Sequence, residues 1–167
     1  SVPPWKTIRG TNAHPSAVFW GTDDLLFAPG PDSGSANLQS VLTGGPSAIL
    51  WRPPDNDYGQ PSISADGRRA AIGRYNSAAA IAVLERDGTM IKEVASLNPR
   101  CVLAHVRLSP HGDLVAVLPS DFAGLRVLNV ATGKPAVKLE VPDIKRCSDV
   151  AWLDDGKHLA GLVTTQA

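Results

Sequence analysis

One turn motif recurs along this chain and constrains its fold more than any other feature. Three short segments have the same layout, in which an apolar residue and a few polar residues lead to a glycine, and their glycines Gly67, Gly112 and Gly156 stand 45 and 44 residues apart. Segment 20–24 has the same shape, with Asp24 at the place of the glycine. A regular period of this length indicates repeated structural units that stack on one another.

Alignment of the four copies on these turns reveals two apolar columns. The residue four positions before the turn glycine is large and apolar, and the residue four positions after it is always alanine: Trp20, Ile63, Leu108 and Trp152 form the first column, and Ala28, Ala71, Ala116 and Ala160 the second. A small residue at a fixed place predicts close packing of neighbouring sheets. The nearly continuous apolar run 114–118 predicts a strand that is covered on both faces in the middle of a sheet.

A second set of turns alternates with the first, at positions 44–45, 87–88 and 132–133. Asp87-Gly88 lies between the apolar runs 81–84 and 90–94, which predicts a β-hairpin. Residues 137–141 alternate between apolar and charged, as an outer strand does when one of its faces is in water. Each unit of about 44 residues therefore predicts four antiparallel strands, and 15 Gly and 14 Pro leave little room for ordinary helices.

These units resemble the blades of WD-repeat and WD-like β-propellers. The turns Ser-Ala-Asp-Gly at 64–67 and Ser-Pro-His-Gly at 109–112 are similar to the Ser-Pro-Asp-Gly turn of that family, and segment 127–134 resembles the region of its Trp-Asp dipeptide. Leu84-Glu85 and Leu128-Asn129 stand in the Trp-Asp place, and no Gly-His dipeptide precedes a first strand, so the hydrogen-bond network of the family does not carry over. The related propeller repeats of periplasmic and peptidase-associated proteins imply the same fold.

The resemblance implies an all-β chain whose 167 residues form one β-propeller portion, an arc of four-stranded antiparallel blades in an incomplete ring. The repeats are expected at about 10–52, 53–97, 98–142 and, in part, 143–167, with 5–8 as one unattached outer strand. Closed propellers have about four to eight blades, and an open arc leaves apolar faces and strand edges in water. Three arrangements would cover these faces and edges. In order of preference they are a longer parent protein, association of two copies into a ring, and a tight closure with four blades.

Composition excludes several classes of function. Sixteen basic and sixteen acidic residues give a formal net charge of zero, so nothing predicts binding to nucleic acid or to an anionic membrane. No apolar run approaches the roughly 20 residues that span a bilayer, and we expect a soluble protein. The chain starts at Ser1 without a leader-like segment, which indicates a processed, excised or trimmed sequence. The compartment stays open, with an intracellular location slightly favoured by the small number of cysteines.

No catalytic, cofactor-binding or metal-binding residue is predicted. Ser109, His111 and Asp113 are crowded on one turn, whereas a catalytic triad converges from separate elements, so we interpret them as a solvated turn. The four histidines and two cysteines have no metal-ligand spacing. Segment 55–59, Asp-Asn-Asp-Tyr-Gly, lacks the glutamate of a helical calcium loop and is typical of turn chemistry.

Five residues are candidates for contact with a partner: Trp5, Trp51, Tyr58, His105 and Phe122. His105 belongs to a predicted first strand, which in propellers lines the central channel. Cys101 and Cys147 precede first strands of adjacent units, and we expect reduced thiols, with a disulfide as the alternative.

The leading hypothesis is a non-enzymatic scaffold for protein–protein interaction, a fragment of a longer propeller protein. It would bind a protein or peptide partner and either the remainder of the propeller or a second copy of the chain. The alternative is the propeller portion of a hydrolase or other enzyme whose catalytic residues lie outside this chain.

Overall fold

The computed structural model describes the backbone of residues 16–20, 24–28, 36–40, 48–51, 61–73, 80–87, 89–95, 103–119, 125–137 and 147–163. Side chains are described within 61–73, 81–87, 91–93, 105–118, 125–137 and 149–162, and at position 89. The described residues form strands and the turns between them. Among them there is no helix that could cross a lipid bilayer.

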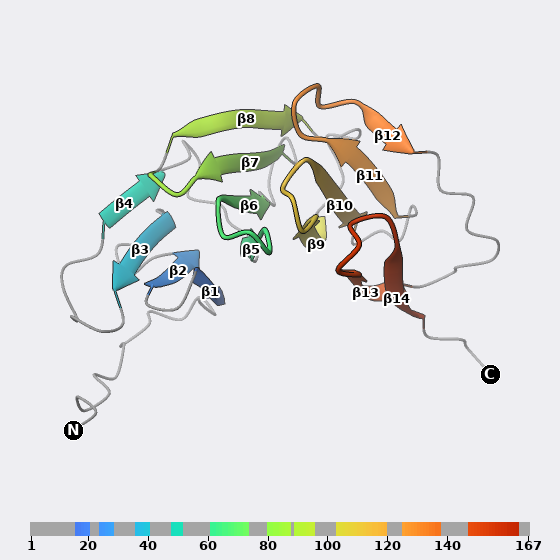
Figure 1. Ribbon diagram of the computed structural model, residues 1–167, viewed down its shortest axis with the longest axis horizontal. Helices are drawn as coiled ribbons and strands as arrows, with labels where there is room; N and C mark the ends of the chain where they lie inside the picture. The colour runs from blue at the N-terminus through green and yellow to red at the C-terminus, as the bar shows by residue number, and fades with distance from the viewer. Residues whose placement is uncertain are drawn as a thin grey trace.

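The strands form four antiparallel sheets that follow one another along an arc (Figure 1). The first sheet contains β1 (Ser16–Trp20), β2 (Asp24–Ala28), β3 (Ala36–Ser40) and β4 (Ala48–Trp51). The second sheet contains β5 (Pro61–Ile63), β6 (Arg69–Gly73), β7 (Ala80–Glu85) and β8 (Met90–Ala95).

The third sheet contains β9 (Leu103–Leu108), β10 (Leu114–Pro119), β11 (Arg126–Asn129) and β12 (Pro135–Val137). The described part of the fourth sheet is the pair β13 (Cys147–Trp152) and β14 (Leu159–Val163). In each four-stranded sheet the strands pair in chain order, so β2, β6 and β10 have a neighbour on either side, as the apolar runs predict. The first strands lie along the concave side of the arc, and β8 and β12 lie on its convex side (Figure 1).

The first hairpins of the later three sheets have one register, and that of the first sheet is tighter. Ile63 pairs with Ala70, Leu108 with Val115, and Trp152 with Leu159, so six residues separate the paired ends in each case. In the first sheet Trp20 pairs with Asp24, and only three residues intervene. Asp24 therefore begins β2, and the prediction that it takes the place of the turn glycine is wrong. The shorter connection brings it into the strand ladder.

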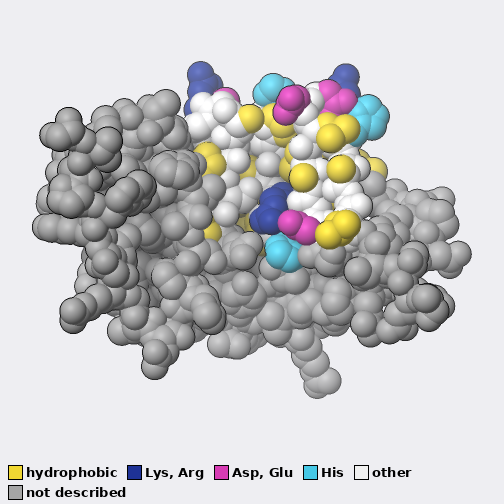
Figure 2. Space-filling view, turned by 90° about the horizontal axis from the view of Figure 1, so that it is seen from below, with side chains coloured by type: hydrophobic (Ala, Val, Ile, Leu, Met, Phe, Trp, Pro, Cys, Tyr) yellow, Lys and Arg dark blue, Asp and Glu magenta, His cyan; other side chains and the backbone are white. Residues whose placement is uncertain are grey.

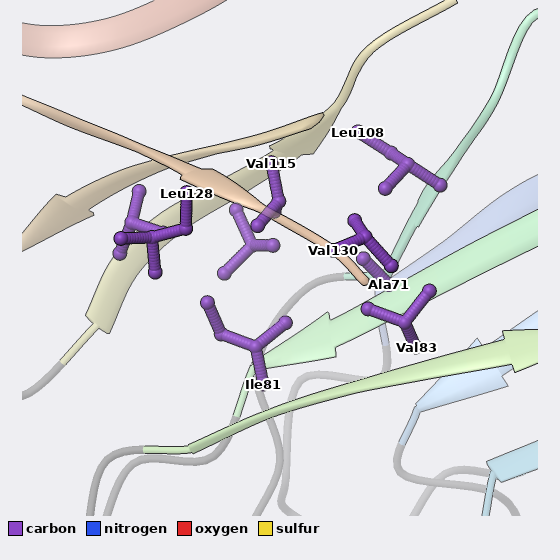
Figure 3. Packing of buried hydrophobic residues seen from close by; sticks show 9 residues of the cluster. Ala71, Ile81, Val83, Leu108, Val115, Leu128 and Val130 are labelled. Carbon is purple, nitrogen blue, oxygen red and sulfur yellow. The ribbon is translucent and has the colours of Figure 1, made fainter. Parts of the chain in front are cut away.

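Apolar side chains fill the space between the second and third sheets. Val83 of β7 points toward Val130, and Ile81 points toward the strand that carries Val115 (Figure 3). All nine members of this cluster are at most 5% exposed, namely Ala71, Ile81, Val83, Val106, Leu108, Val115, Val117, Leu128 and Val130. Burial of this apolar surface, at about 25 cal/mol per Å², is the main force that holds one sheet on the next.

The alanine column lies at the interfaces between sheets. Ala71 and Ala116 are fully buried, Ala71 against the third sheet and Ala116 in the cluster that includes Val150 of β13. Ala160 has the same register position on β14 but is exposed, and Leu162 beside it is 65% exposed. Because successive residues of a strand face opposite sides, Ala160 and Leu162 belong to the face of the fourth sheet that points away from the third.

Ala116→Leu should destabilise the fold, because a close-packed interface has no space for three more carbon atoms. We expect a loss of about 1–3 kcal/mol in the free energy of unfolding. Urea denaturation of dilute protein measures it through the shift in the transition midpoint.

Ala160→Leu is the matched control for this change. It is the same substitution in the same column, at an exposed position, and should alter the free energy of unfolding by less than about 0.5 kcal/mol. Equal effects of the two substitutions would contradict the placement of Ala116 between sheets.

Candidate functional site

The turns between first and second strands are fixed by serine and aspartate side chains. The Ser64 hydroxyl donates to Asp66 Oδ1 at 2.6 Å and accepts from the Arg69 amide at 3.0 Å. Ser109 is fully buried and repeats the pattern, donating to Asp113 Oδ1 at 2.8 Å and accepting from the Leu114 amide at 3.0 Å. The Ser109 hydroxyl is therefore engaged within its own turn. His111 and Asp113 are exposed, as a solvated turn predicts, whereas the prediction is wrong for the buried Ser109.

Direct contacts join the turn of the second sheet to that of the third. The Asp66 amide donates to the Pro110 carbonyl at 3.2 Å, and Arg69 Nη1 donates to the Gly112 carbonyl at 3.0 Å. Arg69 Nε also donates to Glu85 Oε1 of its own sheet at 3.3 Å. Gly112 has a φ of 70°, and a Cβ there would lie 2.8 Å from Arg69 Cδ, so both conformation and space require glycine.

The turn of the third sheet in turn packs on that of the fourth. A Cβ at Gly156 would lie 3.5 Å from the ring carbon Cδ2 of His111 and 3.7 Å from Pro110 Cδ. The three turns thus form one continuous row, in which each turn contacts the next. We call this the turn row, comprising residues 64–69, 109–114 and 153–158.

The turn row presents exposed charged and histidine side chains on one rim of the arc, where Figure 2 shows acidic, basic and histidine groups side by side. These side chains are Asp66, Arg68, His111, Asp113, Asp154, Asp155, Lys157 and His158. The backbone beneath these side chains is held by hydrogen bonds within each turn.

Asp155 has the largest pKa shift in the turn row. A hydrogen bond with His158 Nδ1, at 2.5 Å, is the main cause, and the Lys157 and His158 amides add to it. Together they lower the pKa of Asp155 from 3.8 to about 2. The ionised carboxylate therefore stabilises the turn at pH values above 3.8, and this contribution is lost as the pH falls through about 2.

His158→Ala should raise the pKa of Asp155 toward its ordinary value of 3.8, because the principal hydrogen bond to the carboxylate is lost. Carbon-13 NMR of the aspartate carboxyl groups measures it. Asp66, whose pKa is lowered mainly by the Ser64 hydroxyl, is the internal reference and should not change. An Asp155 carboxyl that already titrates near 3.8 in the unmodified protein would contradict the assigned contact.

A second polar cluster lies on the concave wall of the arc, formed by His105 and Arg107 of β9 and Asp149 of β13. Arg107 Nη2 donates to Asp149 Oδ1 at 2.9 Å, and Arg107 Nη1 donates to the Val106 carbonyl at 3.2 Å. The Asp149 side chain is 49% exposed, whereas those of His105 and Arg107 are 24% and 25% exposed. Figure 2 shows basic, acidic and histidine groups meeting in the middle of this wall.

His105 lies on a first strand, as the sequence predicts, but its ring is only partly open to solvent. Its Nδ1 atom is buried, has no hydrogen-bond partner among the described residues, and lies 3.8 Å from Asp149 Oδ1. That separation is too long for a hydrogen bond. Among the described residues, no three histidine, cysteine or acidic side chains gather as metal ligands would.

Two hydrogen bonds connect the inner strands of adjacent sheets. The Leu108 amide of β9 donates to the Ser62 hydroxyl of β5 at 2.9 Å, and Trp152 Nε1 of β13 donates to the Arg107 carbonyl at 2.9 Å. Leu108 and Trp152 belong to one repeat column, and Ser62 and Arg107 belong to another. The repeat alignment identifies these residues as equivalent. It does not by itself show that residues of one column form hydrogen bonds with residues of the other.

Ser62→Ala should destabilise the fold by about 1–3 kcal/mol, because it leaves the buried Leu108 amide without an acceptor. Guanidinium denaturation measures the effect. Thr132→Ala, which removes an exposed hydroxyl from the β11–β12 turn, is the comparison and should cost less than about 1 kcal/mol. A neutral Ser62→Ala would contradict the bond between sheets.

Several residues singled out from the sequence lie outside the described part of the structure. These are Trp5, Tyr58, Phe122, Cys101, the 55–59 segment and the predicted outer strand at 5–8. Trp51 is the last residue of β4, where the backbone alone is described. The partner contacts proposed for these residues therefore stay predictions.

Comparison with known proteins finds similarity in structure alone. No protein-family model and no curated protein sequence matches the chain. The β-propeller domain of Cps50 (Swd1) from Myceliophteria thermophila is 16% identical, with a TM-score of 0.69, and the match covers 89% of this chain and 50% of that one. Hsv2p from Kluyveromyces lactis is 19% identical, with a TM-score of 0.62, and the match covers 84% of this chain and 49% of that one.

These matches confirm the predicted fold. The chain is an arc of a β-propeller built from antiparallel blades, and it spans about half the length of the solved chains that it matches.

Proposed function

We propose that this chain is a non-enzymatic scaffold for protein–protein interaction, which binds a protein or peptide partner through the turn row. The observation that carries the proposal is the continuity of that row. Arg69 joins the second turn to the third through the Gly112 carbonyl, and His111 packs against the fourth turn at Gly156. Exposed charges fixed on hydrogen-bonded backbone form a preorganised surface, which favours recognition of a complementary polar surface.

The row has the charge pattern of a protein-binding surface. Arg68 and Lys157 stand at its two ends, and the acidic residues lie with them along the row. Because positive and negative side chains are interspersed, a polyanion or a polycation would be repelled by part of the row. A partner whose charges are complementary to the row would be attracted along its whole length. The similarity to solved propellers supports the fold of this chain and is not used as support for its function.

We further propose that the chain is part of a longer propeller, whose remaining blades cover the open end of the arc. The exposed face of β13–β14 supports this, because Leu162 is 65% exposed where the equivalent Leu118 is 1% exposed. The coding sequence on either side of this segment tests the proposal, since further copies of the 44-residue unit should occur there. Flanking sequence without the repeat would contradict it.

Charge reversal at both ends of the turn row tests the scaffold function. Arg68→Glu with Lys157→Glu should lower the affinity for a captured partner by tenfold or more, because charge repulsion then replaces charge pairing. Affinity capture followed by calorimetric titration with the identified partner measures the loss. Both side chains are exposed, so the thermal unfolding midpoint should not change.

Lys134→Glu, an exposed change on the β11–β12 turn, is the matched control and should retain the partner. Equal loss with Lys134→Glu would show that net charge rather than the turn row governs binding. An esterase or peptidase activity abolished by His111→Ala would overturn the non-enzymatic proposal.

A further inference from the structure

One ring nitrogen of His105 is buried without a partner at the boundary between the third and fourth sheets. Among the residues whose side chains are described, His105 Nδ1 is the one buried side-chain nitrogen or oxygen without a hydrogen-bond partner. Nearly all buried polar groups in proteins are paired, because an unpaired group has lost its contacts with water and gained nothing in return. The unpaired nitrogen is thus unfavourable for the ring as it stands.

The Asp149 carboxylate of β13 faces this nitrogen across the boundary. Its Oδ1 atom lies 3.8 Å from His105 Nδ1, about 1 Å beyond an ordinary hydrogen bond. The same oxygen accepts from Arg107 Nη2 at 2.9 Å and from the Val150 amide at 2.8 Å. These two bonds hold the carboxylate beside the imidazole ring, where Figure 2 shows the basic, acidic and histidine groups together.

Protonation changes what the buried nitrogen can do. In a neutral imidazole one nitrogen donates and the other accepts, whereas in the cationic ring both nitrogens donate. A cationic donor at Nδ1 is attracted to the carboxylate, and charge-assisted hydrogen bonds of this kind are about 2.7–2.9 Å long. A small rotation of the His105 side chain is enough to cover the remaining distance. Histidine side chains exchange this proton between about pH 5 and 8.

The strands that pack against β9 determine which charges act on His105. These strands are β5, β6, β10 and β13. Neither β5 nor β10 contains an ionisable side chain, and Leu118 of β10 is the register partner of His105. Strand β6 contains Arg69, whose guanidinium is engaged by Glu85 and by a carbonyl of the turn row.

Strand β13 supplies Asp149, and also Cys147, whose side chain lies outside the described part of the structure. Strand β9 itself supplies Arg107, a positive charge that opposes protonation of the ring. Because Arg107 is already paired with Asp149, a protonated His105 would place that carboxylate between two cationic donors. Asp149 is therefore the group on these strands that attracts the ring proton.

We propose that His105 and Asp149 form a pH-sensitive contact between the third and fourth sheets, which closes when the imidazole ring is protonated. Closure adds to the two bonds that already join β9 to β13, from Arg107 to Asp149 and from Trp152 Nε1 to the Arg107 carbonyl. The stabilisation is present in mildly acidic solution and is lost as the pH rises and the ring gives up its proton. The fourth sheet is thus held more firmly on the third when the solution is acidic.

A double-mutant cycle on the full 167-residue chain tests this contact. His105→Gln removes the titratable ring, Asp149→Asn removes the carboxylate charge, and a third variant combines them. Urea denaturation gives the unfolding constant of each protein at about pH 5.5, where histidine is charged and carboxylates stay ionised, and at about pH 8. We expect the two substitutions to be coupled at least about fivefold at the lower pH and less than about twofold at the higher pH.

His111→Gln is the matched control, because it makes the same change at an exposed histidine of the turn row. Combined with Asp149→Asn, it should be additive at both pH values. The cycle also cancels the loss of the Arg107–Asp149 contact, which Asp149→Asn causes whether or not His105 is present. Absence of coupling at about pH 5.5, or equal coupling at the two pH values, would overturn the proposal.

NMR of the unmodified protein provides a second measurement that does not depend on the folding of a variant. In nitrogen-15-labelled protein at about pH 5.5, the proton on His105 Nδ1 should give a slowly exchanging signal, because a buried and hydrogen-bonded proton is protected from water. The signal should disappear at about pH 8. An Nδ1 proton that exchanges rapidly at the lower pH would overturn the proposal.

Discussion

Face-to-face packing of sheets through a column of alanines is the interaction on which the rest of this structure depends. Ala71 and Ala116 are fully buried, each at the boundary between one sheet and the next. A small side chain in a central strand lets larger residues of the neighbouring sheet, such as Val106 and Val150, approach closely. Protein interiors are packed about as densely as organic crystals, and this close approach recurs at the two interfaces whose side chains are described.

Polar contacts then determine how the stacked sheets present their turns. Hydrogen bonds from Ser64 and Ser109 hold each turn in shape, and Arg69 reaches from the second sheet to the carbonyl of Gly112. The turns of the second, third and fourth sheets are therefore in mutual contact, and the proposed binding function depends on the rigidity of that row.

The repeat made the fold predictable from the sequence. A hairpin at 87–88, a central strand at 114–118 and close packing at Ala71 and Ala116 follow from local pattern, and the structure confirms all three, whereas Ala160 of the same column is exposed. The first hairpin is present as predicted, but the place of Asp24 in its turn is wrong, because a shift of three residues leaves the apolar pattern nearly intact while it moves Asp24 into β2. Sequence periodicity reports which residues face the core, but it does not report how many residues a turn contains.

The sequence by itself determined the repeating unit and its strands, since period, apolar alternation and turn residues act over short distances along the chain. Tertiary structure alone decided which polar groups meet across sheets, as in the contact of Arg107 with Asp149, because those partners stand 42 positions apart and neither has a distinctive neighbourhood. It also decided that Ala160 is exposed and Ala116 buried. The two alanines are equivalent in the repeat, and they differ because, among the described residues, a further sheet covers Ala116 and none covers Ala160.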